Sequence, residues 1–361
     1  MLRYTVMNIK IETFGQVNGE RVDLIHLSNQ NGMLVKITNY GCIVTSIETQ
    51  DCQGHFKDIV LGFDTLNEYL QGHPFFGAVV GRYANRINHG LFKIKDQIYQ
   101  LEKNELSTSQ HIHGGSVGFD KYIWNYSIEK NETLIMIHFY RLSPNGESGY
   151  PGNLNITHSI GLDEQNQLHF YFTATTDQTT IINLTNHSYY NLSGHDQGYI
   201  CHHYLKIFSD YYTPVAQNMI PTGEILSVKH TGLDFRKAIK IGDNMDKLKD
   251  KTLDHNFILN GEVAYDEYHK AAELYDPESG RFLTVITTQP AIQVYNAAKL
   301  SNKCWMGKNQ YKYESFAAIC LETQHFPDSP NHRHFPNTLL EPDQIYKQKT
   351  IYQFSVKDNQ G

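Results

Sequence analysis

Four hydrogen-bonding side chains stand in a row near the middle of the chain. They are Thr185, Asn186, His187 and Ser188, and they follow the β-branched stretch 179–184, whose pattern predicts a strand. These hydroxyl, amide and imidazole groups suit a neutral ligand rich in hydroxyls, because each ligand hydroxyl both donates and accepts a hydrogen bond. A buried hydroxyl left unpaired costs about 1–3 kcal/mol. The pattern favours a binding pocket, and the alternative is a polar strand edge with a structurally satisfied histidine.

A single carboxylate, Glu322, ends a second apolar stretch. Residues 316–321 are small or apolar and lead directly to it. A carboxylate at the end of a buried strand is costly unless it is paired or functional. We therefore interpret Glu322 as a candidate acid or base, with a structural ion pair as the alternative.

Two loop segments add further polar groups. His111 and His113 stand before a Gly-Gly pair, and alternation places both on one side if the segment is extended. Two histidines at this spacing could bind a metal ion, but no matching ligand set lies within a short span, so a histidine facing a pocket is favoured. In the segment 81–87, Asn85 and Arg86 offer planar donors to a ligand oxygen, and the alternative is a pair of surface arginines.

Composition excludes several classes of partner. The 361 residues are 40% apolar and only 19% charged, with 24 Tyr and 19 His, so much of the polar character comes from uncharged side chains. The net charge is -7 without a basic cluster, which argues against nucleic acid as a partner. We expect a small-molecule ligand instead.

The cysteines and the N-terminus indicate a reducing compartment. Five cysteines are scattered without a Cys-x-x-Cys pair, a pattern that suits free thiols better than a disulfide framework or a zinc site. The N-terminal stretch lacks the apolar core of a signal peptide, and no apolar run approaches the ~20 residues of a membrane span. The sequence predicts a soluble, cytoplasmic protein without membrane contact.

Short alternating stretches dominate the chain and predict an all-β sandwich or barrel. They include 34–47 with a turn at 39–41, 58–63, 76–81, 134–142, 154–160, 168–175, 179–184, 253–259, 282–287, 290–296 and 345–356. Helical candidates are a single turn capped by Asp64 and the charged stretch 243–251. No linker compels a boundary, so we expect a single domain over residues 1–361.

Eight stretches, taken together and in order, resemble the aldose 1-epimerase (galactose mutarotase) family. They are 81–87, 113–115, 149–152, 184–192, 254–257, 279–281, 293–295 and 322–324. The resemblance implies a large twisted antiparallel β-sandwich with few short helices, and catalysis without a metal or cofactor. Ile112 and Tyr190 depart slightly from the family pattern, and neither is at a catalytic position.

The resemblance also implies a role for each polar residue. Glu322 corresponds to the general base that takes the proton of the anomeric hydroxyl, and His187 to the general acid that protonates the ring oxygen. His113 corresponds to a second histidine near that oxygen. The residues that hold the sugar hydroxyls are Asn85, Arg86, Asp254 and Gln293. We expect an ionised carboxylate and a protonated imidazole.

Three other functions fit part of this pattern. A glycoside hydrolase could use Asp254 and Glu322 as its two carboxylates, but it would leave both histidine stretches without a role. A non-catalytic carbohydrate-binding sandwich would not require the buried carboxylate. A hexose-6-phosphate 1-epimerase relative would need an extra cationic pocket. The preferred sugar, and the choice between monomer and homodimer, stay open.

Overall fold

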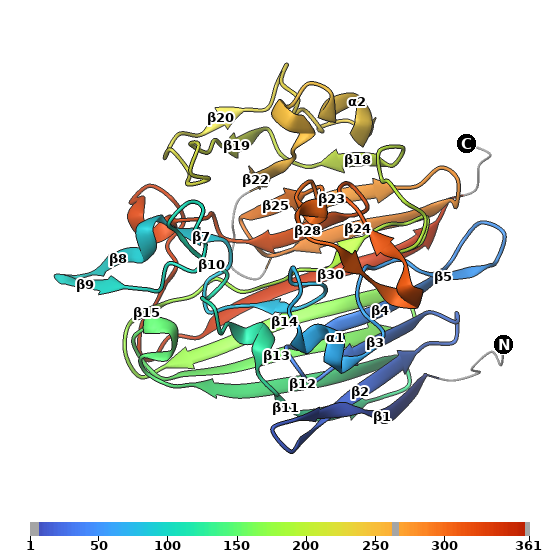
Figure 1. Cartoon of the computed structure of the whole chain (residues 1–361), viewed down its shortest axis with the longest axis horizontal. Helices are drawn as coiled ribbons and strands as arrows, with labels where there is room; N and C mark the ends of the chain where they lie inside the picture. Colours follow the sequence, from blue (N-terminus) through green and yellow to red (C-terminus); the bar gives the residue numbers. More distant parts are fainter. Residues whose placement is uncertain (1–6, 262–266, 358–361) are drawn as a thin grey trace.

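The computed structural model describes residues 7–261 and 267–357, and antiparallel strands make up most of it. The all-β prediction is confirmed. The largest sheet has nine strands and crosses the middle of the molecule (Figure 1). In spatial order they are β11 (Asn125–Lys130), β12 (Leu134–Ser143), β13 (Leu154–Asp163), β14 (Gln167–Thr176), β30 (Tyr346–Val356), β24 (Arg281–Thr287), β23 (His269–Tyr275), β18 (Tyr204–Ile207) and β21 (Ile239–Lys240).

Two smaller sheets accompany it. The five-stranded sheet is a meander in blue at the lower right of Figure 1: β1 (Asn8–Val17), β2 (Glu20–Ser28), β3 (Leu34–Thr38), β4 (Val44–Gln50) and β5 (Phe56–Asp58). The six-stranded sheet has the order β17 (Tyr189–Tyr190), β28 (Ile319–Gln324), β25 (Ala291–Tyr295), β22 (Asp254–Ile258), β19 (Tyr211–Thr213) and β20 (Leu226–Ser227).

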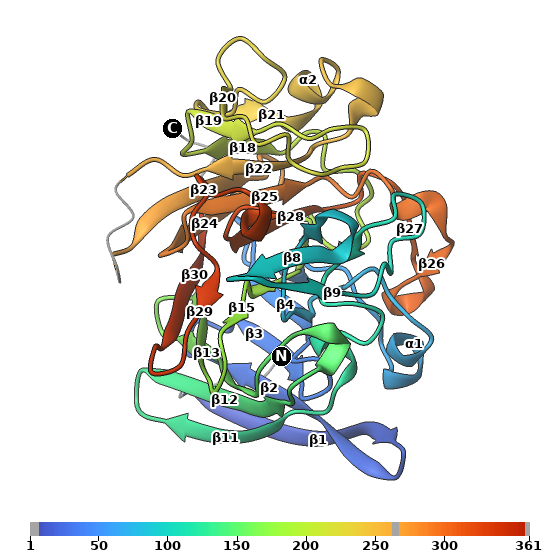
Figure 2. The ribbon, with the colours of Figure 1, turned by 90° about the vertical axis from the view of Figure 1, so that its left-hand side faces the viewer.

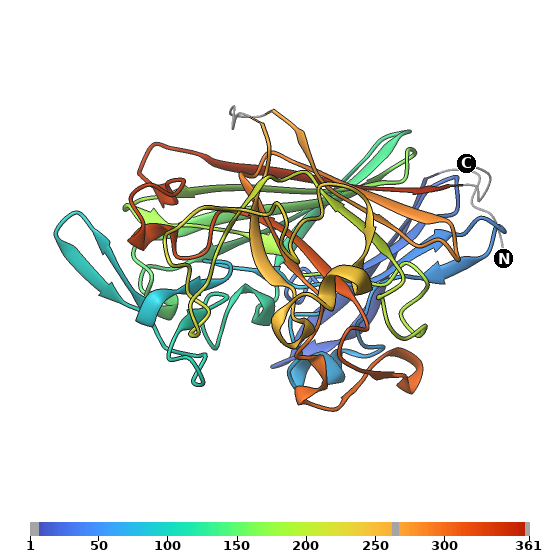
Figure 3. The same cartoon turned by 90° about the horizontal axis from the view of Figure 1, so that it is seen from above.

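Short strand pairs tie the loops to this frame. They are β7 (Arg86–Ile87) with β10 (His111–Ile112), β6 (Val79–Val80) with β16 (Thr185–Asn186), β15 (Thr180–Ile181) with β29 (Leu339–Leu340), β8 (Leu91–Ile94) with β9 (Gln97–Gln100), and β26 (Trp305–Met306) with β27 (Lys312–Tyr313). The β8–β9 hairpin projects from one end of the molecule (Figures 1 and 3). Figure 2 shows β24, β30 and β13 along one side, and β9, β27 and α1 (Leu66–Leu70) toward the other.

The core lies between the sheets. One continuous apolar cluster takes Val35 from β3, Phe139 from β12, Phe170 from β14, Val294 from β25 and Leu321 from β28. Strand β30 shows the underlying period of two, since every second residue from position 346 to 354 is buried. Each large apolar side chain buried in this way contributes about 1.5–3 kcal/mol. Face-to-face packing of sheets around a shared core is a sandwich arrangement.

Several predicted elements differ in extent. The helical turn is α1, but its N-cap is Thr65, which forms a capping box with Glu68, so Asp64 as the cap was wrong. The second helix, α2 (Ile241–Met245), begins earlier and ends sooner than 243–251. Beyond β5, the predicted strand 58–63 is reduced to an isolated bridge between Val60 and Tyr190 of β17.

Two other predictions concern the chain's surroundings. No helix within the described ranges is long and apolar enough to cross a membrane. All five cysteines are free thiols, as the sequence predicts.

Candidate active site

Three neighbouring strands of the six-stranded sheet place Glu322, Gln293 and Asp254. Gln293 on β25 stands directly opposite Glu322 on β28, so both side chains leave the same face of the sheet. Gln293 Nε2 donates a 2.7 Å hydrogen bond to Asp254 Oδ1 on β22. Strand pairing therefore brings together residues separated by up to 68 positions in sequence (322 minus 254).

His187 lies against this trio. Its Nε2 is 3.6 Å from Glu322 Oε2, and both side chains are buried. The imidazole is stacked between Phe75 and Tyr189, whose ring centroids are 5.9 and 5.1 Å away. Its backbone N–H donates to Ala78, and its carbonyl accepts from Gly77. Ring stacking and backbone pairing thus fix the direction in which the imidazole faces Glu322.

The neighbours of His187 do not face a ligand. Thr185 donates its hydroxyl hydrogen to the Thr323 carbonyl, and Asn186 donates to the Gly77 carbonyl. Asn186 Oδ1 also accepts hydrogen bonds from the backbone and hydroxyl of Ser188. The polar run is therefore structural at three positions, where the alternative interpretation was right. Only His187 of the four contacts Glu322.

His113 adopts a backbone conformation that turns it toward His187. The two ring centroids are 5.4 Å apart, and His113 has a φ of 53° instead of the extended geometry that the alternation required. Gly114 allows this turn, because a Cβ there would lie 1.8 Å from the Gly81 carbonyl oxygen. His111 is separate, and its ring nitrogens bond Tyr150 and the Glu102 carbonyl.

A reciprocal contact between His113 and Asn85 decides the tautomer of the imidazole. The backbone N–H of His113 donates to the Asn85 carbonyl, and His113 Nδ1 accepts from the Asn85 backbone N–H at 3.2 Å. Neutral His113 must then carry its proton on Nε2. The side chain offers a fixed N–H donor.

Arg86 is held by a carboxylate that the sequence interpretation did not single out. Its Nε and Nη2 donate to Glu105 at 2.7 and 2.6 Å, which leaves Nη1 outside this two-point contact. Asn85 Oδ1 accepts the backbone N–H of Arg86, so the Asn85 amide NH2 is the group left for a ligand. Arg82 and Arg86 are both buried, and the surface-arginine alternative is wrong.

Burial controls the protonation of the site. It raises the pKa of Glu322 well above its usual value, Asp254 raises it further, and Arg86 lowers it. Burial lowers the pKa of His187 to about 4 and that of His113 well below its usual value. These shifts favour a neutral carboxyl beside a neutral imidazole, the reverse of the expected charges. Both arrangements contain the same number of protons. They differ only in whether the one transferable proton is on the Glu322 carboxyl or on the His187 imidazole.

Three buried polar atoms at this site have no hydrogen-bond partner among the described residues. They are Glu322 Oε2, His187 Nδ1 and Gln293 Oε1. Buried polar groups are normally paired, so unpaired ones from adjacent elements indicate a place where a ligand completes the network. The contacts described above connect the seven residues to which the family resemblance gives a role, and those roles stay predictions: Asn85, Arg86, His113, His187, Asp254, Gln293 and Glu322.

Phe75 is a contact that the sequence did not identify. Its half-buried ring has its centroid 4.7 Å from that of His113 and is also stacked on His187. The residue has a φ of 63°, a conformation uncommon for an aromatic residue. Nothing in the sequence separates it from the other aromatic residues, because its position follows from a loop conformation.

Two groups of described residues could hold a metal ion. The first, at this site, is His187, Cys320 and Glu322, and the second is His202, His203 and Asp276. Within each group the possible ligand atoms lie within 4.8 Å of one another. The sequence interpretation anticipated neither group.

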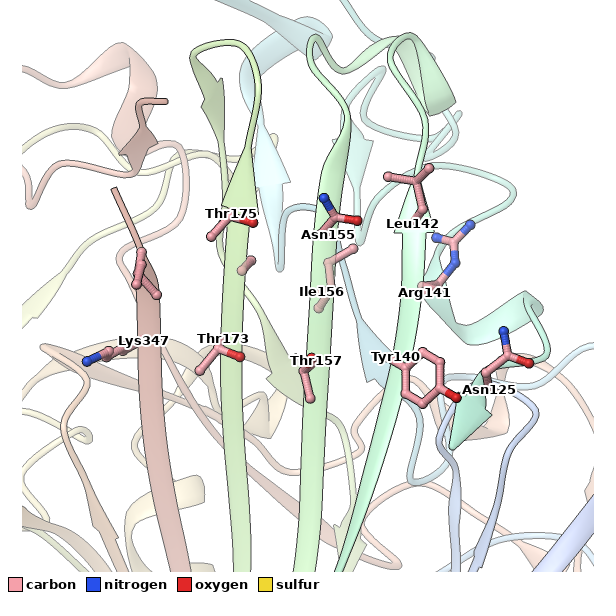
Figure 4. Close-up of a pocket in the computed structure, with 12 residues that line it drawn as sticks. Asn125, Tyr140, Arg141, Leu142, Asn155, Ile156, Thr157, Thr173, Thr175 and Lys347 are labelled. Atoms are coloured by element: carbon pink, nitrogen blue, oxygen red, sulfur yellow. The ribbon is translucent and has the colours of Figure 1, made fainter. Parts of the chain in front are cut away.

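A large groove lies elsewhere, on the outer face of the nine-stranded sheet (Figure 4). It has a volume of about 640 Å³ and is lined by residues such as Tyr140, Asn155, Thr157, Thr173 and Lys347. Tyr140 is exposed, whereas its neighbour Phe139 points into the core. No carboxylate or histidine is among the residues that line the groove, so it lacks the acid–base pair found around Glu322.

Comparison with known proteins identifies the family. The family model described as aldose 1-epimerase matches residues 23–353. Galactose mutarotase of Bos taurus is 42% identical over 322 residues, which cover 89% of this chain and 91% of that protein. Aldose 1-epimerase of Escherichia coli (strain K12) is 32% identical over 343 residues, 93% of this chain and 96% of that protein.

A solved structure agrees with this match. The crystal structure of galactose 1-epimerase from Lactobacillus acidophilus NCFM superposes with a TM-score of 0.84 at 28% identity, covering 98% of this chain and 100% of that one. The predicted resemblance is confirmed, and the chain belongs to the aldose 1-epimerase family.

Proposed function

We propose that this protein interconverts the α and β anomers of free aldohexoses such as galactose and glucose. The observation that carries the proposal is the buried His187–Glu322 pair, with its polar atoms 3.6 Å apart and Glu322 Oε2 unpaired among the described residues. Anomer exchange requires one base and one acid at the anomeric centre, and this pair supplies both.

Glu322 is the proposed base and His187 the proposed acid. The carboxylate takes the proton from the O1 hydroxyl, the imidazolium gives a proton to O5, and the C1–O5 bond breaks to give an aldehyde. Rotation about C1–C2 exposes the other face, and ring closure returns both protons. Ring opening leaves a neutral carboxyl beside a neutral imidazole, the protonation that burial favours.

The starting charges require help from the site. Before ring opening, Glu322 must be ionised and His187 protonated, against the direction set by burial. Arg86 lowers the pKa of Glu322 and so favours its ionisation, whereas Asp254 raises the pKa of both groups, which favours protonated His187 but opposes ionised Glu322. Sugar hydroxyls that donate to the carboxylate would add to this shift.

The remaining polar groups are proposed to hold the sugar. Gln293 Oε1 is an acceptor without a partner in the described part of the chain, and Asp254 is oriented by the Gln293 amide. Asn85 and Arg86 add donors, and the Nε2–H of His113 is proposed to face the ring oxygen. Phe75 is the proposed apolar surface beneath the sugar, because its ring touches both histidines.

The charges around the site support a neutral sugar over a phosphorylated one. Arg86 is paired with Glu105, and Lys121, whose Nζ lies 5.8 Å from the centroid of the Phe75 ring, is paired with Asp120 at 3.0 Å. A phosphate pocket needs cations that are not already neutralised. We therefore place free sugars ahead of hexose 6-phosphates.

Polarimetry of freshly dissolved α-D-glucose and α-D-galactose tests the proposal. We expect the wild-type protein to speed the approach to the same final rotation, and we expect Glu322→Gln to lose this effect. A control without protein gives the spontaneous rate. Acceleration that persists in Glu322→Gln would remove this residue from its role, and no acceleration with either sugar would contradict the proposed substrates.

We also propose a reducing compartment such as the cytoplasm. The support is that all five cysteines are free and that two of them, Cys42 and Cys320, are buried. Titration of the purified protein with a thiol reagent under denaturing, non-reducing conditions should count five thiols. A lower count that reduction restores would contradict it.

A further inference from the structure

Cys320 lies next to the proposed acid–base pair. It stands two residues before Glu322 on β28, so both side chains leave the same face of the strand. In the sheet it is opposite Tyr189 on one side and Tyr295 on the other, and it is fully buried. Its Sγ, a ring nitrogen of His187 and a carboxylate oxygen of Glu322 all lie within 4.8 Å of one another.

These three atoms are the ligand types that zinc prefers. Zinc binds Cys sulfur at about 2.3 Å, His nitrogen at about 2.0–2.1 Å and carboxylate oxygen at about 2.0–2.2 Å, and sites with three protein ligands keep a fourth position open. Tetrahedral geometry at those bond lengths separates ligand atoms by roughly 3.3–3.8 Å. The 3.6 Å between His187 Nε2 and Glu322 Oε2 is close to the roughly 3.3–3.5 Å that these bond lengths give a nitrogen–oxygen pair.

A second observation points to a ligand here. Glu322 is 2% exposed, and its Oε2 has no hydrogen-bond partner within residues 7–261 and 267–357. An unpaired buried oxygen keeps its full capacity to coordinate a cation. The stacking of His187 between Phe75 and Tyr189 holds its Nε2 toward Glu322 Oε2.

We propose that His187, Cys320 and Glu322 form an inhibitory site for a thiophilic divalent cation such as Zn²⁺. Inhibition rests on the proposed function, because the ion occupies the two groups assigned to proton transfer and excludes the sugar. On binding, the Cys320 thiol loses its proton to solvent, and the His187–Glu322 pair loses the one proton that it holds. The ion then faces a thiolate, a carboxylate and a neutral imidazole.

Zinc chloride titrated into the polarimetric assay tests the inhibition. We expect zinc to raise the apparent KM for galactose while kcat at saturating sugar is unchanged, and excess EDTA to restore the rate. EDTA alone should leave the untreated protein's rate unchanged, and Mg²⁺, which prefers oxygen ligands, should not inhibit. Zinc inhibition that saturating galactose does not relieve would overturn the proposal.

Cys320→Ala isolates the thiol. We expect this variant to keep its basal rate, since Cys320 has no proposed part in proton transfer. Its zinc inhibition constant should rise by at least about 100-fold, because even changes outside the ligand shell cost 10- to 100-fold in metal affinity. Cys304→Ser, at an exposed thiol, is the matched control and should be inhibited like the wild type. Equal inhibition of Cys320→Ala and wild type would overturn the proposal.

Equilibrium dialysis against zinc separates this site from the proposed function. We expect galactose to displace one tightly bound ion from the wild type, and Cys320→Ala to bind one ion fewer than the wild type. Binding is measured without turnover, so it can succeed or fail whatever the polarimeter shows. If Cys320→Ala does not fold, judged by circular dichroism, Cys320→Ser provides the same comparison with a side chain of nearly equal size. Equal zinc stoichiometry in the folded variant and the wild type would overturn the assignment.

Discussion

Two regions of this protein each bring together two histidines and one carboxylate, but the two carboxylates differ in how far the protein's own hydrogen bonds satisfy them. We call His113, His187 and Glu322 the Glu322 cluster, and His202, His203 and Asp276 the Asp276 cluster. Asp276 accepts hydrogen bonds from the Ser193 hydroxyl and from the backbone N–H groups of residues 278 and 279. Glu322 Oε2 has none within the described part of the chain.

The pKa shifts of the two carboxyls follow from this difference. Burial alone would raise the pKa of Asp276, but hydrogen bonds from His202, Ser279 and Ser193, together with nearby His203, lower it strongly. Burial raises the pKa of Glu322 because fewer groups oppose it. A carboxylate saturated by its own protein stabilises the fold, whereas one left unsatisfied is available for a ligand or a proton.

Replacing Glu322 should give the largest effect on activity. Glu322→Gln keeps the shape of the side chain but cannot take a proton, so we expect kcat to fall by roughly 10³-fold, within the range for a lost acid–base group. Sugar binding, measured by calorimetry, should survive. Unfolding in urea should show equal or greater stability, since a buried ionisable group has been removed. A substantial loss of stability would make Glu322 resemble Asp276 and break the comparison.

His187→Ala should lower activity by about 10²-fold or more if the imidazole transfers a proton. Stopped polarimetric assays give the rate, and circular dichroism checks the fold. The matched variant is His203→Ala in the Asp276 cluster, which should lose stability but not intrinsic activity. If the His187→Ala rate loss were matched by an altered dichroism spectrum, the residue would belong with the structural histidines instead.

Asp276→Ala should reverse the pattern seen for Glu322→Gln. The change removes the acceptor of the Ser193 hydroxyl and of the backbone N–H groups of residues 278 and 279, which are only partly buried. We expect a total loss of about 1–3 kcal/mol in unfolding free energy. The folded fraction should keep its kcat/KM. Urea unfolding monitored by fluorescence measures the first, and polarimetry the second. Unchanged stability would show that the hydrogen bonds of Asp276 contribute little.

Acid should destabilise the protein through histidines of both clusters. Burial lowers the pKa of His203 to about 3 and that of His187 to about 4, below the value of about 6.5 in an unfolded chain. Stability from these neutral rings is complete above about pH 6.5 and is lost as pH falls toward the folded pKa, by up to about 1.4 kcal/mol per pH unit for each histidine.

His203→Gln tests this pH dependence. Its amide oxygen can still accept the Leu192 N–H that now bonds His203 Nε2, but it does not titrate. We expect the unfolding free energy of the variant to decline less steeply between about pH 6.5 and 4. The difference in slope should approach about 1.4 kcal/mol per pH unit, the value for one proton taken up on unfolding. Parallel pH profiles for variant and wild type would mean that His203 takes up no proton on unfolding.

The sequence predicted which residues are polar and near a strand, but it could not predict the hydrogen-bond partners that separate the two clusters. The strand pattern located His187 and Glu322, and the family resemblance supplied their roles, which remain proposals. The sequence could not show that the side chains of Thr185 and Asn186 bond backbone carbonyls and that the Ser188 hydroxyl bonds Asn186. The predicted strand 179–184 is also shorter than expected: β15 covers only Thr180–Ile181, and Asn183 forms an isolated bridge with Tyr83.

The Asp276 cluster was missed for a related reason. His202 and His203 are adjacent in sequence and 73 positions or more from Asp276 (276 minus 203), and only the pairing of β18 with β23 brings them near each other. Phe75 depends on a left-handed backbone conformation that no sequence pattern announces. The strands themselves were predictable because alternation is local. The single-domain expectation for residues 1–361 stays a prediction.

Glu105 gives the smallest expected effect and the sharpest test of the comparison. Like Asp276 it is saturated, here by Arg86 and the Thr108 hydroxyl, and these bonds lower its pKa although burial would raise it. Unlike Asp276, it holds a residue proposed to bind the sugar. Glu105→Gln keeps one acceptor but loses the two-point contact that fixes the guanidinium.

We expect Glu105→Gln to raise the KM for galactose by about 10-fold, the equivalent of one charge-assisted hydrogen bond, and to change kcat little. A purely structural carboxylate would lower stability and leave KM unchanged, which is the outcome that would contradict this assignment. Glu102→Gln is the matched control, since Glu102 lies in the same loop and bonds Ser116 but not Arg86. A KM increase confined to Glu105→Gln would show that a satisfied carboxylate can act on the ligand through the cation that it positions.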